Sequence, residues 1–142
     1  DQTFLNAQQA VGVANDMHNT THSGTADDCS DALAWHVSFF ARLVAGLRDT
    51  EEVDGSSLLD HTTVVLLFEG GHGHDPEGVQ DNRAHSTENM SALIAGRVGG
   101  LQGGRHIATD RAHPARVVAS ALSAVGLGDS LGEISGRLDG LF

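Results

Sequence analysis

The run Thr62-Thr63-Val64-Val65-Leu66-Leu67-Phe68 decides how the rest of this sequence is interpreted. Its β-branched and large apolar residues follow one another without polar alternation, which is typical of a strand covered on both faces. We expect such a strand in a parallel sheet, because parallel sheets carry helices on both faces. A second short apolar strand is predicted over residues 92–95, ending at Gly96.

Helical patterns lie on either side of the two predicted strands. Residues 31–49 predict an amphipathic helix, because apolar residues recur at steps of three and four from Leu33 onward. Ser30 or Asp31 is expected to cap its first turn. Pro114 predicts the start of a second helix, which runs to about Val125 and is ended by Gly126.

The order helix, strand, loop, strand, helix predicts an α/β fold in which a sheet is layered with helices. We expect residues 1–142 to form one such domain or the C-terminal portion of a larger one. Within it, residues 1–30 predict a loop-rich lead-in and residues 128–142 an irregular tail. The glycine-rich residues 99–104 predict tight turns or a hairpin.

The charge balance excludes some classes of partner. The 142 residues contain nineteen acidic and eight basic side chains, all eight of them arginine, for a net charge of −11. Nucleic acid and anionic lipid both require basic patches, so neither is expected to bind. No stretch approaches the roughly 20 apolar residues of a membrane span, and the single Cys29 cannot form an internal disulfide.

Candidate metal ligands follow the first strand directly. The loop reads Glu69-Gly70-Gly71-His72-Gly73-His74-Asp75, and His85 precedes the second strand. Histidine nitrogen and carboxylate oxygen are common metal ligands, and ligands gather at strand ends in open α/β sheets. The pattern predicts a divalent metal site built from Glu69, His72, His74 and His85; the alternative is a solvated turn that happens to contain histidines.

His18 and His22 are additional candidates, because a four-residue spacing would place them on one helix face. The intervening Asn19, Thr20 and Thr21 are poor helix formers, so we expect a loop contribution to a shared site, or simple exposure. His61 is isolated in the sequence and is assigned no role. The chain shows neither a Walker-type phosphate loop nor a Gly-x-Ser-x-Gly elbow, and its spacing reveals no nucleophile.

Several segments together resemble a known group of proteins. They are residues 64–71, 85–90, 93–100 and 104–105, supported by residues 18–24, 56–60 and 128–132. This pattern resembles the C-terminal half of an uncharacterised family of secreted bacterial proteins, found in myxobacteria and planctomycetes. That family is similar to the alkaline phosphatase and sulfatase superfamily, so the resemblance implies an alkaline-phosphatase-like sheet, incomplete in this chain, in an exported protein.

The resemblance also implies chemistry. Glu69 would occupy the superfamily's acidic ligand position, His72 would stand near its usual histidine, and His85 would match the later one. The cofactor would be a divalent ion, zinc or calcium, acting on a phosphate or sulfate ester, with Arg97 or Arg105 gripping the oxyanion. This sequence departs from the superfamily pattern at Gly70, and it has glutamate where aspartate is commoner.

The superfamily's nucleophile normally lies in the N-terminal half. The resemblance therefore implies that a missing N-terminal segment or another protein chain supplies it, and that the protein can be an oligomer. The alternative function is a non-catalytic secreted protein that keeps the fold for binding or assembly.

Overall fold

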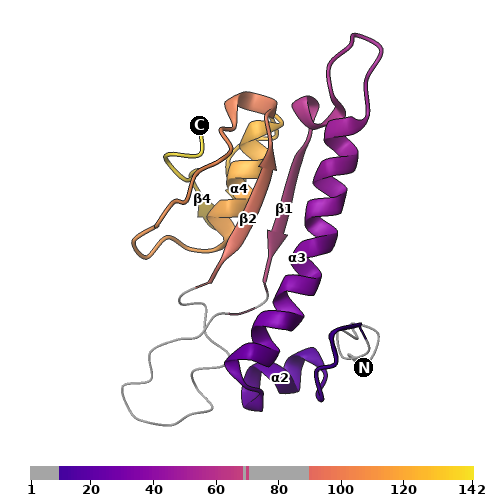
Figure 1. Ribbon diagram of the computed structural model, residues 1–142. Helices are drawn as coiled ribbons and strands as arrows, with labels where there is room; N and C mark the ends of the chain where they lie inside the picture. The colour runs from indigo at the N-terminus through magenta and orange to yellow at the C-terminus, as the bar shows by residue number, and fades with distance from the viewer. Residues whose placement is uncertain (1–9, 69, 71–89) are drawn as a thin grey trace.

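The computed structural model describes residues 10–68, 70 and 90–142 (Figure 1). The helices are α2 (Met17–Ser23), α3 (Ala26–Asp49) and α4 (Ala115–Ala124), with short 3₁₀ turns η2 (Leu58–His61) and η4 (Val98–Gly100). The strands are β1 (Thr63–Leu67), β2 (Ala92–Gly96), β3 (Ser130–Leu131) and β4 (Ile134–Ser135). Helices and sheets are thus combined, as the α/β prediction requires.

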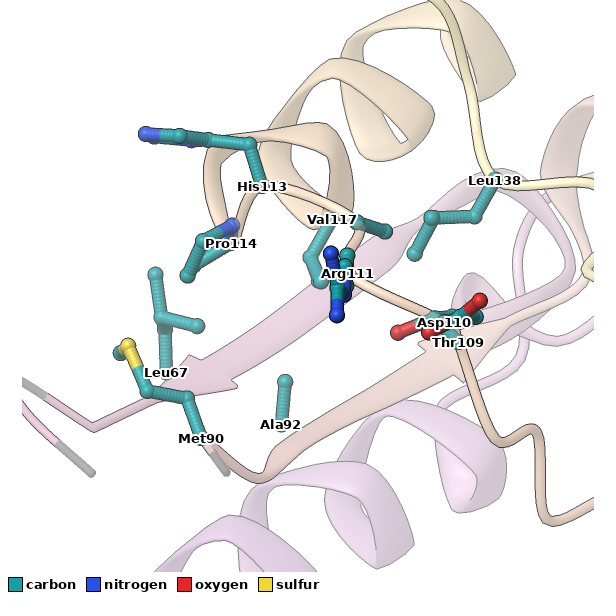
Figure 2. A pocket seen from close by; sticks show the side chains of 11 residues that line it. Leu67, Met90, Ala92, Thr109, Asp110, Arg111, His113, Pro114, Val117 and Leu138 are labelled. Atoms are coloured by element: carbon teal, nitrogen blue, oxygen red, sulfur yellow. The ribbon is translucent and has the colours of Figure 1, made fainter. Parts of the chain in front are cut away.

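The prediction of a parallel sheet is wrong for the two main strands. β1 and β2 pair antiparallel, with Thr63 opposite Gly96 and Leu67 opposite Ala92. An apolar run without alternation requires cover on both faces, and helices can give that cover to an antiparallel pair as well. Both α3 and α4 contact β1, and Figure 2 shows the strand pair between the two helices.

Helix α3 begins earlier than the sequence pattern indicates. It ends at Asp49 as predicted, but its cap is Thr25 and not Ser30 or Asp31. The Thr25 hydroxyl accepts from the Asp28 amide at 3.1 Å, and the Asp28 carboxylate accepts from the Thr25 amide at 3.1 Å. This reciprocal capping box adds a turn made of polar residues, which carry no apolar stripe to predict it.

The lead-in is more ordered than its composition suggests, because α2 lies within it. Asp16 caps α2 by accepting from the Asn19 amide at 2.8 Å. Thr20 is buried, and the Cys29 thiol of α3 donates to its carbonyl oxygen at 3.2 Å. These contacts hold α2 against α3 and offset the poor helix propensity of its sequence.

The second predicted helix is confirmed: α4 spans Ala115–Ala124, with Pro114 and Val125 as its caps. Its inner face joins a core cluster made with the end of the chain. The buried members are Leu101, Ala124, Leu138 and Leu141, and the partly buried residues packed against them are Ile94, Val98, Ile107, Ala112, Val117 and Phe142. Residues 128–142, expected to be irregular, therefore supply core side chains and the small β3–β4 hairpin.

No helix in the described residues is both long and apolar enough to cross a membrane. The longest of them, α3, carries six aspartate and arginine side chains along its length: Asp27, Asp28, Asp31, Arg42, Arg48 and Asp49.

Candidate functional site

The β1–β2 pairing determines where the chain leaves and re-enters the main sheet. β1 ends at Leu67 and β2 starts at Ala92, and these two residues are opposite one another in the register. The predicted ligands Glu69, His72, His74 and His85 fall between them in the sequence and lie outside the described residues. Both ends of the segment that carries them are thereby joined to one edge of the sheet.

A cavity of about 800 Å³ lies at this same edge. Its apolar wall combines the strand ends with α4 and the chain's C-terminal stretch, and its polar wall is the turn that leads into α4. The lining residues are Leu67, Met90, Ala92, Thr109, Asp110, Arg111, Ala112, His113, Pro114, Val117 and Leu138. Figure 2 shows Arg111 near the middle of the labelled side chains, where it overlaps Val117 in this view.

Arg111 differs from the other arginines that the structure describes. Its guanidinium forms no hydrogen bond or ion pair with any described residue, whereas each of the others has a partner. Arg48 and Arg97 pair with carboxylates, Arg105 and Arg116 donate to carbonyl oxygens, and Arg42 and Arg137 lie over aromatic rings. Arg111 is also the one non-glycine residue with positive φ, +51°, in the described part of the chain.

His113 connects the cavity wall to the start of α4. Its Nδ1 accepts from the Ala115 amide at 3.2 Å, and its carbonyl oxygen accepts from the Arg116 amide at 2.9 Å. Accepting at Nδ1 in the neutral ring leaves the proton on Nε2, so the outer nitrogen is a donor. Figure 2 shows this ring directed away from Arg111.

The two arginines predicted to grip an oxyanion are engaged elsewhere, and neither lines the cavity. Arg97 donates to Asp60 Oδ1 at 2.9 Å, and Arg105 donates to the Gly140 carbonyl oxygen at 2.9 Å. The Asp60 pKa lies below its usual 3.8, chiefly because the carboxylate accepts from the Ser57 amide and then because of Arg97. The Arg97–Asp60 hydrogen bond thus connects the residue that follows β2 with η2.

The structure places His18 and His22 together on α2. Their ring centroids are 4.6 Å apart, one helical turn from each other, and the planes are tilted by 57°. The four-residue spacing therefore has the geometric consequence expected of a helix, although a loop had been predicted here.

A second group of metal-ligand side chains was not predicted from the sequence. Ligand atoms of Glu52, Asp54 and His61 all lie within 4.8 Å of one another. His61 Nε2 is 3.6 Å from a Glu52 oxygen and 4.0 Å from an Asp54 oxygen. Ligands bound tetrahedrally at about 2.1 Å from a zinc ion are separated by roughly 3.4 Å, so a small movement would suit this donor set to such an ion.

Ser56 bridges Asp54 and His61 within this group. Its hydroxyl bonds with the Asp54 carboxylate and lies 2.8 Å from His61 Nε2. The Ser56 hydroxyl, then its amide, keeps the pKa of Asp54 below the usual 3.8, which favours the charged, ligand-competent form. The sequence signal was the Asp54-Gly55 turn, which reverses the chain and returns it to η2.

No protein-family model, no curated protein and no solved structure matches this chain.

Proposed function

We propose that this chain is part of an exported, metal-dependent domain of the alkaline-phosphatase and sulfatase type, acting on a phosphate or sulfate ester. The observation that carries the proposal is the meeting of Leu67 and Ala92 in the sheet register. It joins both ends of the segment bearing Glu69 and His85 to one edge, where the cavity with Arg111 also lies. Ligands at a strand edge beside a lined cavity are the usual arrangement of an active site.

In this proposal Glu69 and His85 are metal ligands, with His72 or His74 completing the set. A divalent ion bound there, zinc or calcium, would polarise the ester and lower the pKa of a nucleophile. The chain's own share of the chemistry is to hold the ester's charged group, and the nucleophile comes from a further segment or another chain. The acidic, lysine-free surface is compatible with a secreted protein.

The metal part of the proposal is tested by elemental analysis of the purified chain after dialysis. We expect about one zinc or calcium ion per chain, retained by Asp54→Asn/His61→Ala and lost by Glu69→Ala/His85→Ala. If Glu69→Ala/His85→Ala keeps the metal and Asp54→Asn/His61→Ala loses it, the metal is bound by Glu52, Asp54 and His61 instead. Absence of stoichiometric metal from the wild-type chain would remove the hydrolase proposal.

The catalytic part needs a separate measurement. A panel of aryl phosphates and aryl sulfates is incubated with the metal-loaded chain and with the full-length gene product. We expect hydrolysis by the full-length product, sensitive to Glu69→Ala/His85→Ala and restored by neither zinc nor calcium in that variant. Lack of turnover by a metal-loaded full-length product would contradict the catalytic proposal and leave the binding role.

A non-catalytic role in binding or assembly is the second candidate, and the surface of α3 favours it. Ala32 is the one buried residue of this helix, and Phe39 and Leu43 remain 48% and 52% exposed. A helix of 24 residues with an uncovered apolar stripe is typical of a surface that another segment or chain covers. Light scattering of wild type and Phe39→Ser/Leu43→Ser tests this role: association that persists in the variant would contradict it.

A further inference from the structure

We infer that the cavity at the β1–β2 edge binds a singly charged oxyanion carried on an apolar group, such as an aromatic carboxylate or sulfate. Arg111 would hold the anionic group, and the strand ends would pack against the apolar part. The inference concerns binding alone, so it goes beyond the proposed ester hydrolysis and stands whether or not the chain hydrolyses anything.

The Arg111 guanidinium has no hydrogen-bond or ion-pair partner among the described residues, which is the first argument. Arginine presents a planar set of five donors, whose fork geometry matches two oxygens of a carboxylate or sulfate. Each of the other described arginines has a carboxylate, carbonyl or aromatic partner, whereas none of the described carboxylates lies within ion-pair distance of Arg111. In a chain of net charge −11, an arginine whose guanidinium has no partner among the described residues is available for an external anion.

The apolar wall is the second argument. The apolar lining of the cavity comes from Leu67, Met90 and Ala92 at the sheet edge, and from Val117 and Leu138 on the core side. A dry cavity of about 150 Å³ already accepts benzene, so the volume of about 800 Å³ leaves ample room for an aromatic ring beside its charged group. Burying that ring would supply the affinity that an exposed ion pair lacks.

Asp110 determines which anions fit. It neighbours Arg111, lines the same cavity, and forms no ion pair or hydrogen bond with the described residues. Its negative charge opposes a second negative charge on the ligand, because like charges at short range disfavour each other. Arg111 and Asp110 together carry no net charge, in a chain of net charge −11, so a second negative charge on the ligand adds more repulsion than attraction. We therefore expect a monoanion to bind more tightly than a dianion.

Titration calorimetry of the 142-residue chain tests the inference with four probes of similar ring size: benzoate, phenyl sulfate, phenyl phosphate and benzyl alcohol. The pH is set well above about 6, so that the phosphate is doubly charged. We expect benzoate and phenyl sulfate to bind one per chain, about tenfold or more tightly than neutral benzyl alcohol. Phenyl phosphate should bind several-fold more weakly than phenyl sulfate.

Three variants separate the contributions. Arg111→Gln should weaken benzoate about tenfold or more, and Arg48→Gln, an exposed arginine on α3, should leave it unchanged despite the same loss of charge. Asp110→Asn should bring phenyl phosphate level with phenyl sulfate. Equal benzoate affinity in Arg111→Gln and wild type would overturn the inference, as would absence of benzoate binding at millimolar concentration. Preference of wild type for phenyl phosphate would overturn the assignment of Asp110.

Discussion

Arg111 combines two features that rarely coincide without a reason. It has a backbone conformation that most L residues avoid, with φ of +51°, and its guanidinium has no partner among the described residues. A left-handed conformation costs an ordinary residue about 1–2 kcal/mol. Strained residues of this kind concentrate at binding sites, where side-chain placement outweighs local stability.

Replacing Arg111 by glycine should therefore stabilise the chain while removing the proposed anion-binding group. The relief of strain, about 1–2 kcal/mol, exceeds the extra backbone entropy of glycine, about 0.5–1 kcal/mol, so we expect a net gain of roughly 0.5 kcal/mol. Urea unfolding measures it. Arg111→Gln removes the same charge but keeps the Cβ atom, and should show no gain; equal stability of the two variants would argue against strain at this position.

Asp60 gives a pH-dependent prediction. Its pKa is lowered by the Ser57 amide first and by Arg97 next, so its ionised form stabilises the folded state. A lowered folded pKa means that this stabilisation is complete above 3.8 and is lost as pH falls through the folded pKa. We expect Asp60→Asn to be less stable than wild type at neutral pH, with the difference disappearing in strong acid.

Denaturant unfolding across that pH range checks this expectation. Asp139→Asn is the matched control, because the Asp139 side chain forms no hydrogen bond or ion pair with the described residues. If the free energy of unfolding of Asp60→Asn stays below that of wild type by the same amount at every pH, the charge of Asp60 is not what stabilises the fold.

Individual site residues differ in how far the sequence could reveal them. Glu69 and His85 are visible because a carboxylate and histidines cluster beside an apolar run, and their roles stay predictions. His61 was assigned no role, since its partners Glu52 and Asp54 approach it only after the Asp54-Gly55 turn and η2 reverse the chain. No motif marks Arg111, because its importance depends on a cavity that residues distant in sequence create.

At the scale of elements, apolar periodicity predicted the element boundaries that are set by packing against the core. The end of α3 at Asp49, the limits of α4 and the strand at residues 92–96 follow the apolar pattern closely. The start of α3 and the whole of α2 depend on side-chain caps at Thr25 and Asp16, which leave no periodic trace. Strand direction was mispredicted because an apolar run reports cover on its faces and not the orientation of its neighbour.

In residues 128–142, too, the apolar pattern does not reveal contacts made by single polar side chains. This tail lacks periodicity because it is mostly turns, yet polar contacts hold it to α4. Arg116 donates to the carbonyl oxygens of Gly136 and Arg137, and a further contact is buried. The Ser120 hydroxyl, fully buried, accepts from the Leu138 amide at 2.8 Å and donates to the Arg116 carbonyl at 2.7 Å. Composition alone could not predict that a buried serine on α4 would fix the last residues of the chain.

Ser120→Ala should destabilise the chain by about 1–3 kcal/mol, because the buried Leu138 amide would lose its partner. Thermal or urea unfolding measures the loss, and hydrogen exchange should show a larger effect on the Leu138 amide than on the amides of α3. Ser123→Ala, on the same helix and without a side-chain hydrogen bond to the described residues, should cost little. Alanine is the better helix former, so propensity alone would stabilise both variants. A Ser120→Ala variant no less stable than Ser123→Ala would therefore show that the hydrogen bond to the Leu138 amide contributes little.

At the scale of the whole molecule, repulsion between acidic side chains is the dominant long-range interaction. The net charge is −11, and of the described arginines only Arg48 and Arg97 form ion pairs with carboxylates. Arg48 and Asp49 are both exposed, and Arg97 is exposed against a partly buried Asp60, so neither pair offsets the repulsion by much. The remaining carboxylates repel one another across the surface, which favours the expanded unfolded chain over the folded one.

Salt should therefore stabilise this protein. Raising the salt concentration from about 0.01 M to 0.3 M shortens the screening length from about 30 Å to below 10 Å, so the repulsion between distant carboxylates is removed. We expect Tm to rise by a few degrees in sodium chloride, with calcium chloride at equal ionic strength adding a further rise only where a divalent site is present. Asp54→Asn/His61→Ala and Glu69→Ala/His85→Ala, tested separately, identify which group produces that further rise. A Tm that falls as sodium chloride is added would mean that attractive pairs, not repulsion, dominate the surface.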